Sequence, residues 1–170
     1  LRAGDIPQGF STAGGQTRNP HHPDYGPAGS SGGTGAGIAA SFAQFGLGSD
    51  TQSSVRGPAA TNGVVGLRPT LGLISRTGLI PLALSLDTIG PITRSVHDLA
   101  VVLGVIAGAD NADPLTAGSA GKAESDYTRY LKVGSLKGAR IGVARDFGGE
   151  DPISSRDRAI EWPWHQTKTS

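Results

Sequence analysis

The chain has no cysteine and no methionine among its 170 residues. Without cysteine it can form no disulfide framework, no thiolate metal site and no cysteine nucleophile. The adjacent residues His21 and His22 lie in a proline-rich stretch without a clustered carboxylate, which favours a solvated surface over a metal site. Any nucleophile that the chain carries must therefore be another residue type.

The chain has no large excess of either sign of charge, because 15 lysines and arginines are balanced by 14 aspartates and glutamates, which leaves a net charge of +1. No basic cluster stands out, so a nucleic-acid backbone is not an expected partner. No window reaches the ~18 apolar residues of a membrane span, and no basic segment followed by an apolar one opens the chain. The sequence predicts neither a nucleic-acid nor a membrane partner, with the cytoplasm as the default location.

Glycine and proline are plentiful instead, with 27 and 11 residues, while hydrophobic residues make up 36%. This composition predicts a loop-rich globular chain of about one domain. Residues 1–29 are rich in turn signals and are expected to form a loop approach. Small apolar residues predict a buried helix over 35–43, and short strands are expected over 45–49 and 64–67.

The clearest helix signal begins at Ser95, which forms a variant of the capping box with Asp98. Apolar residues follow at near-helical spacing, and Gly108 ends the helix. Residues 110–135 are expected to form a connection that contains a short helix at 127–131. Residues 137–144 are expected to form a turn into a strand, and residues 150–170 a poorly determined tail.

Two serine-bearing glycine loops carry the functional signal. The first is Gly29-Ser30-Ser31-Gly32-Gly33, and the second spans residues 48–59, with Ser54 lying 24 positions after Ser30. Because glycine adopts turns that other residues resist, such loops let a side chain and several backbone N–H groups face one point. Two such loops at element junctions suggest a nucleophile and an oxyanion hole.

Other motif interpretations are weaker. Residues 29–33 also fit the G-x-S-x-G nucleophile elbow, but that motif needs a preceding strand, which residues 25–28 do not resemble. Residues 119–122 fit S-x-x-K within a linker-like composition, and the glycine-rich residues 32–35 lack the lysine of a phosphate-binding loop. Without a functional role, the small residues of both loops would simply permit tight turns and close packing.

The stretch from residue 14 to about 114 resembles the amidase signature family, the serine hydrolases that cleave carboxamides. That family's GGSSGG loop appears here as Ala28-Gly29-Ser30-Ser31-Gly32-Gly33. Its GTDxGGSIRxPA loop appears at the matching distance as residues 48–59. Three further segments are similar to the family: 63–70, 75–81 and 85–95.

The resemblance implies an α/β fold of α/β/α layers with a mixed central sheet, incomplete in this chain. It assigns residues 1–149 to a partial amidase signature domain and leaves 150–170 as the tail. It also implies a Ser-cisSer-Lys triad in which Ser54 is the nucleophile. Ser30, after a cis bond to Gly29, would relay a proton between Ser54 and the lysine.

Further roles follow from the same resemblance. The backbone N–H groups of Thr51, Gln52, Ser53 and Ser54 would form the oxyanion hole. Supporting positions would be Ser31, Asp50 and Arg56. The chemistry needs no metal and no cofactor, because the serine requires only a base within reach of its proton, ultimately an amine kept neutral by burial.

Two departures from the family pattern matter. The family's lysine lies several tens of residues before the relay serine, but none of the 29 residues before Ser30 is a lysine. The chain is therefore expected to be a truncated member and inactive alone. The second departure is Gln52-Ser53 in place of Gly-Gly, which narrows the allowed backbone conformations of the predicted oxyanion hole.

The implied function is hydrolysis of a carboxamide C–N bond through a serine acyl-enzyme, with a small-molecule or peptide amide as the partner. Gln52-Ser53 weakly disfavours a glutaminase-type subunit of a tRNA-dependent amidotransferase, which is the first alternative. A non-catalytic remnant or binding module is the second. A homo-oligomer is left open.

Overall fold

A computed structural model describes residues 8–140 of the chain. The chain divides into two compact units, Leu1–Val133 and Gly134–Ser170. All the elements below belong to the first unit. Residues 141–144 of the predicted strand and the whole predicted tail at 150–170 lie outside the described residues.

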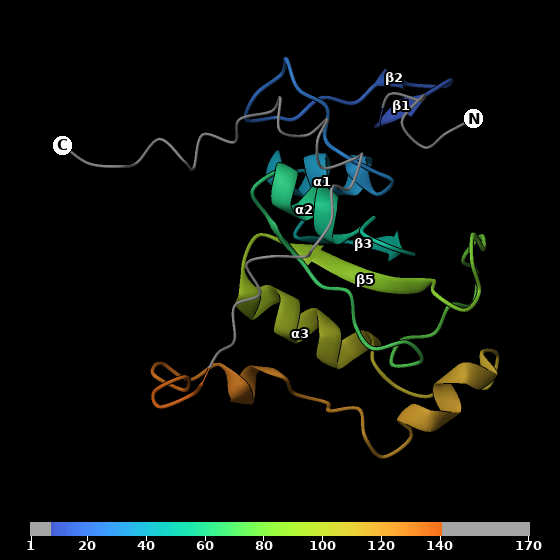
Figure 1. Cartoon of the computed structure of the whole chain (residues 1–170), viewed down its shortest axis with the longest axis vertical. Helices are drawn as coiled ribbons and strands as arrows, with labels where there is room; N and C mark the ends of the chain where they lie inside the picture. The colour runs from blue at the N-terminus through green and yellow to red at the C-terminus, as the bar shows by residue number, and fades with distance from the viewer. Residues whose placement is uncertain (1–7, 141–170) are drawn as a thin grey trace. The chain divides into compact units, whose positions relative to one another are not determined.

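A three-stranded sheet lies at the centre of the first unit (Figure 1). Strand β5 (Thr88–Thr93) is central, with β3 (Phe45–Asp50) and the short β4 (Val65–Gly66) on either side. Both pairings are antiparallel, and Asp50 lies opposite Thr88 in the β3 and β5 register. The mixed sheet implied by the resemblance stays a prediction for strands beyond these three.

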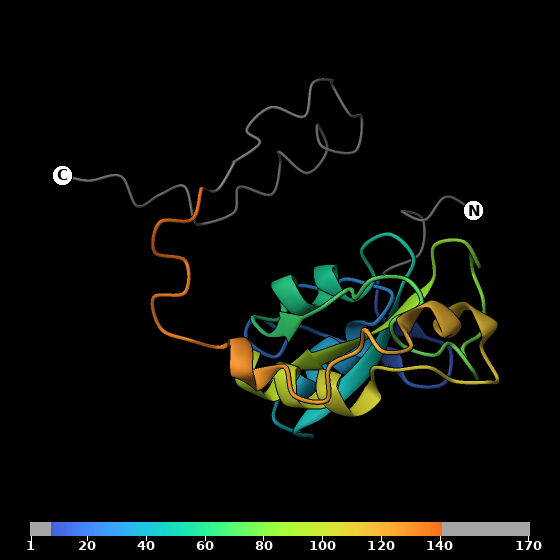
Figure 2. The same ribbon diagram turned by 90° about the horizontal axis from the view of Figure 1, so that it is seen from below.

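Helices cover both faces of this sheet. α1 (Gly32–Ala39) and α2 (Arg56–Thr61) lie on one face, and α3 (Val96–Ile106) on the other (Figure 1). Figure 2, turned to look from below, shows α3 in front of the strands. The three layers agree with the α/β/α arrangement expected for this part of the chain.

The core between α1, α2 and the sheet is small. Ile38 of α1, Val55 before α2 and Ile92 of β5 form its buried cluster. Glycines let α1 approach β3 closely: a Cβ on Gly46 would lie 2.5 Å from the Thr34 methyl, and one on Gly48 would lie 2.6 Å from Ser31 Oγ. The glycines of β3 therefore bring the start of α1 directly against the sheet.

The predicted helix at Ser95 is confirmed. Ser95 Oγ accepts a hydrogen bond from the Asp98 N–H at 3.1 Å, which satisfies a donor that the first helical turn leaves free. The helix ends at Ile106, and Gly108 follows with a φ of 143°. This element was predictable because its signals are local.

Several other predictions need correction. The first helix begins at Gly32 and ends at Ala39 rather than spanning 35–43. Strand β3 is partly exposed rather than buried, since Phe45 and Leu47 remain 50% and 45% exposed. The expected loop approach contains a hairpin of β1 (Phe10–Ser11) and β2 (Gly15–Gln16).

The predicted connection and short helix are also refined. A 3-10 helix, η1 (Pro114–Ser119), lies within the connection, and a second, η2 (Thr128–Tyr130), replaces the short helix expected at 127–131. Asp113 begins η1 by accepting a hydrogen bond from the Leu115 N–H at 3.2 Å. Asp-Pro supplies both a capping side chain and a first-turn residue that needs no N–H partner.

Candidate active site

The first serine loop lies between the end of the β1 and β2 hairpin region and the start of α1. Its Gly29–Ser30 peptide bond is cis, which confirms the prediction for this bond. Ala28 has a φ of 59°, the left-handed region that favours glycine, at the position where the family motif has one. Ser30 is exposed to solvent.

The second serine loop connects β3 to α2 and is held against the first. The Ser31 N–H donates a hydrogen bond to the Ser54 carbonyl at 3.1 Å. Ser54 is half-buried, whereas Gln52 and Ser53 are exposed. The structure therefore brings the two predicted serine loops together, although within residues 8–140 the hydroxyls of Ser30 and Ser54 make no hydrogen bond to each other.

Ser31 also fastens its loop to the outer edge of β3. Its Oγ accepts a hydrogen bond from the Ser49 N–H at 3.2 Å and donates one to the Ser49 carbonyl at 3.3 Å. Thr34 Oγ1 donates to the Leu47 carbonyl at 3.1 Å on the same edge. Two side chains of the loop and α1 thus occupy backbone groups that an edge strand would leave unpaired. The Ser31 hydroxyl is therefore engaged in hydrogen bonds with the backbone of β3.

Asn62 holds the first loop from the side of α2. Its Nδ2 donates to the carbonyl of Pro27 at 2.9 Å and to that of Pro58 at 2.8 Å. The side chain is fully buried. Sequence reasoning missed this residue because an asparagine at a helix end has the usual signature of a local cap.

Asp50 organises the second loop from its N-terminal end. The carboxylate is fully buried and accepts hydrogen bonds from the Val55 N–H at 3.0 Å and from Arg56 Nε at 3.3 Å. Arg68 Nη1 pairs with its other oxygen at 2.9 Å. Burial raises the pKa of Asp50, but these hydrogen bonds outweigh it and hold the pKa below its ordinary value.

The two arginines differ in exposure. The Arg56 side chain is 51% exposed and donates to the Gln52 carbonyl as well as to Asp50. Arg68 is 23% exposed and bridges Asp50 to the Leu86 carbonyl at 2.6 Å. Arg68 was not predicted as a site residue, although it lies within the segment 63–70 that resembles the family.

A second carboxylate, also not predicted as a site residue, contacts Thr51 at the start of the loop. Thr51 Oγ1 donates a hydrogen bond of 2.5 Å to Asp87 Oδ1. The N–H groups of Leu82 and Ala83 donate to Asp87 Oδ2 at 2.8 Å each. The bond from Thr51 is the largest influence that lowers the pKa of this buried carboxyl, whose residue is 2% exposed.

The backbone between these anchors has free donors. Within residues 8–140, none of the N–H groups of residues 51–54 donates a hydrogen bond, whereas those of Val55 and Arg56 both reach Asp50. Unpaired N–H groups beside a serine can stabilise negative charge on a bound oxygen. These are the N–H groups that the resemblance assigns to the oxyanion hole, and that role stays a prediction.

No lysine in the described part of the chain contacts either serine loop. Its lysines are Lys122, Lys132 and Lys137, all exposed, and no hydrogen bond or ion pair between residues 8 and 140 connects them to either serine loop. These residues also hold no cluster of three or more potential metal ligands. None of the helices that the structure describes has the length and apolar character to span a membrane.

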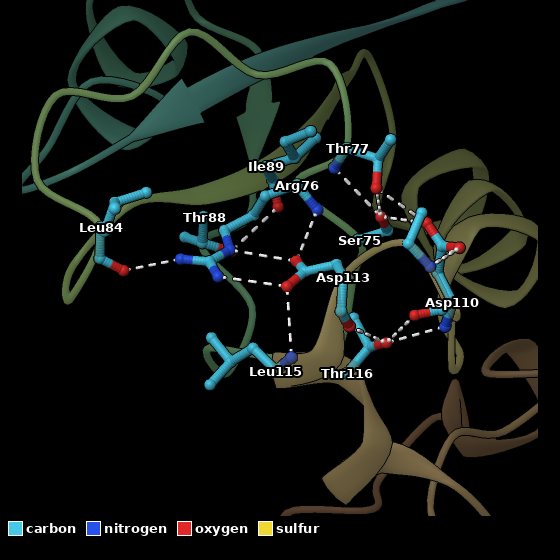
Figure 3. A network of polar contacts seen from close by, with 11 residues as sticks. Ser75, Arg76, Thr77, Leu84, Thr88, Ile89, Asp110, Asp113, Leu115 and Thr116 are labelled. Carbon is cyan, nitrogen blue, oxygen red and sulfur yellow. Dashed lines mark hydrogen bonds and ion pairs between the residues drawn. The ribbon is translucent and has the colours of Figure 1, made fainter.

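A separate polar network fixes the segment that leads to Asp87 (Figure 3). Arg76 pairs with both carboxylate oxygens of Asp113, at 3.1 and 3.2 Å, and its backbone N–H donates to Oδ2 at 2.9 Å. Arg76 Nη1 also donates to the Leu84 carbonyl at 2.6 Å. The hydrogen bonds from Arg76 lower the pKa of Asp113 to about 2.

Asp110 forms the other half of this network. Its Oδ2 accepts hydrogen bonds from Ser75 Oγ at 2.5 Å and from Thr77 Oγ1 at 3.0 Å. Thr116 Oγ1 accepts from the Asp110 N–H at 2.7 Å (Figure 3). The segment around Ser75 to Thr77 is thereby tied to the region around η1.

Comparisons with known proteins identify the family to which the chain belongs. The Amidase family model matches residues 6–162. One subunit of the glutamyl-tRNA(Gln) amidotransferase of Caldanaerobacter subterraneus is 52% identical over 133 residues, which cover 78% of this chain and 26% of that protein. The solved structure of native peptide amidase from Stenotrophomonas maltophilia is 46% identical, with a TM-score of 0.80, over 91% of this chain and 33% of that one.

A further solved structure, that of the corresponding glutamyl-tRNA(Gln) amidotransferase subunit from Thermotoga maritima, is 50% identical with a TM-score of 0.60. It matches 62% of this chain and 23% of its own length. The chain belongs to the amidase signature family. It spans about a quarter to a third of the length of the relatives that it matches.

Proposed function

We propose that this chain carries the nucleophile and oxyanion hole of an amidase whose substrate is a small-molecule or peptide amide. One observation carries the proposal most directly: the Ser54 loop has unpaired N–H groups over residues 51–54 and is tied through Ser31 to the loop that bears Ser30. The family membership supports the assignment of these loops to amide chemistry.

In the proposed reaction, Ser54 Oγ attacks the amide carbonyl carbon and its proton passes to Ser30, which gives its own proton to a neutral amine base. The N–H groups of residues 51–54 stabilise the resulting oxyanion. The C–N bond then breaks as the leaving nitrogen takes a proton, which leaves an acyl ester on Ser54. Water cleaves that ester and restores the serine.

The base in this scheme is the lysine that the resemblance implies. The first lysine in the sequence is Lys122, far after both serines. The whole protein would supply the base from a segment that precedes this chain, as the resemblance implies. A serine hydroxyl without a base is a poor nucleophile near neutral pH.

Covalent labelling of the full-length protein tests the nucleophile. We expect a fluorophosphonate probe to modify the wild-type protein at Ser54 and to leave Ser54→Ala unlabelled. Ser41→Ala, which removes an exposed hydroxyl at the end of α1, serves as the matched control and should label normally. Undiminished labelling of Ser54→Ala at another residue would refute the assignment.

A second candidate is the glutaminase activity of a tRNA-dependent amidotransferase. The similarity to glutamyl-tRNA(Gln) amidotransferase sequences favours it, because the identity reaches 52% over 133 residues. The two candidates differ in substrate. Release of ammonia from free glutamine, with no cleavage of C-terminal peptide amides, would favour the amidotransferase; the reverse pattern would favour the peptide or small-molecule amidase.

A further inference from the structure

The backbone of residues 51–54 is held at its two ends by different carboxylates. Asp50 accepts from the Val55 N–H at 3.0 Å and so fixes the end that leads into α2. Asp87 accepts from Thr51 Oγ1 at 2.5 Å and so fixes the end that leaves β3. Between them, the N–H groups have no acceptor in the described structure, while Arg56 and the Gly57 N–H hold the carbonyls of Gln52 and Ser53. Thr51, at the start of the loop, is held through its side chain by Asp87.

The sheet places Asp87 for this contact. Asp50 ends β3 and lies opposite Thr88, the first residue of β5, so Asp87 directly precedes the register partner of Asp50. The N–H groups of Leu82 and Ala83 fix its second oxygen. The carboxylate is thus held in place by contacts other than the one with Thr51.

We propose that Asp87 is a positioning residue that orients the oxyanion-hole N–H groups through the Thr51 hydroxyl. This inference rests on the proposed amidase function. Charge-assisted hydrogen bonds are stronger and more directional than neutral ones, so this contact restricts the rotation of the first peptide groups of the loop. Asp87 itself does not touch the substrate.

The consequence is a specific kinetic signature. An oxyanion hole acts on charge that develops in the transition state, so its misorientation lowers kcat while leaving ground-state binding nearly intact. We expect a roughly tenfold to hundredfold loss of kcat, smaller than the effect of removing a donor outright, which is about 10²–10³. KM should change by less than about twofold.

The experiment is a double-mutant cycle in the full-length protein. Thr51→Val removes the hydroxyl and keeps the branched shape, and Asp87→Asn keeps the size and removes the charge. Because both changes disrupt one contact, the double variant should lose no more kcat than the more affected single variant. Fluorophosphonate labelling of Ser54 should slow in parallel, since the phosphonyl oxygen occupies the same hole.

Matched controls separate this effect from a general loss of structure. Thr70→Val and Asp24→Asn make the same chemical changes at exposed positions and should keep wild-type kcat. If Asp87→Asn fails to fold, Thr51→Val alone decides. An unchanged kcat in Thr51→Val, or additive losses in the cycle, would overturn the inference.

A different result would refute the proposed amidase function itself. If Ser54→Ala keeps amidase activity or fluorophosphonate labelling, the proposed function is wrong and the cycle concerns only stability. If Ser54→Ala abolishes both while Thr51→Val leaves kcat intact, the proposed function stands and the positioning role is refuted.

Discussion

At the scale of single residues, several side chains hold the site by binding backbone groups of the serine loops. Ser31, Asn62 and Asp50 each fix a carbonyl or an N–H of a serine loop. Such contacts leave little trace in the sequence, because serine, asparagine and aspartate are also common in ordinary turns. The resemblance identified the serines, while the structure identified what holds them.

Ala28 offers a test at this scale. Its φ of 59° lies in the left-handed region, where a Cβ costs about 1–2 kcal/mol, and glycine removes that cost. Glycine also raises the entropy of the unfolded chain, which offsets about 0.4–1 kcal/mol. We therefore expect Ala28→Gly to increase the free energy of unfolding by about 0.5–1 kcal/mol, measured by urea denaturation.

The matched control is Ala60→Gly in α2. Ala60 is exposed within a helix, so glycine there should decrease the free energy of unfolding by about 1 kcal/mol. A loss of stability in Ala28→Gly similar to that of Ala60→Gly would contradict the explanation based on φ.

At the scale of elements, signals within a short stretch of sequence predicted the structure correctly, whereas features that depend on contacts between distant segments were not predicted. Ser95 and Asp98 indicate the start of α3 within four residues of sequence. α1 begins among glycines of poor helix propensity, and its start at Gly32 depends on packing against the glycines of β3, which no local window contains. β5 was missed because it contains Pro91, a residue that argues against a central strand.

The register explains why β5 tolerates this proline. The β4 ladder ends with Gly66 opposite Ile92, and Leu67, the next residue, donates its N–H to the Pro91 carbonyl at 3.1 Å. On the other side Pro91 lies opposite Leu47. Because proline has no N–H to donate in return, Pro91 lies where the pairing with β4 ends.

The pairing of Arg76 with Asp113 belongs to this scale, because it joins two segments distant in sequence. The folded state lowers the pKa of Asp113 to about 2, so the carboxylate contributes stability above the unfolded value of about 3.9 and loses that contribution as the pH falls toward 2. We expect Asp113→Asn to be destabilised at pH 7, with the difference from wild type shrinking between pH 4 and pH 2.

Urea denaturation at several pH values measures this difference. Arg76→Gln should reduce the same pH dependence, because it removes the partner of the carboxylate. Lys122→Gln, which removes an exposed cation, should stay within about 0.5 kcal/mol of wild type at pH 7. A constant difference between Asp113→Asn and wild type across the acid range would show that the pair does not set this dependence.

At the scale of the whole molecule, residues 8–140 fix the two serine loops against each other, and no lysine among these residues contacts either loop. Residues 8–140 supply both loops, their carboxylate anchors and the free N–H groups. The absence of a lysine before Ser30 is read directly from the sequence. The Ser-Ser-Lys arrangement stays a prediction, because it depends on a base that no contact among residues 8–140 supplies.

The last prediction follows from the absence of a lysine before Ser30. We expect the purified 170-residue chain to show no amide hydrolysis above the uncatalysed rate, because a neutral serine hydroxyl without an adjacent base loses most of its nucleophilic reactivity. Removing one member of a coupled triad typically costs about 10⁴–10⁶ in kcat. Hydrolysis by the full-length protein should depend on Ser54, with Ser54→Ala as the control. Hydrolysis by the isolated chain that disappears in Ser54→Ala would mean that a base within these residues, or water itself, activates the serine.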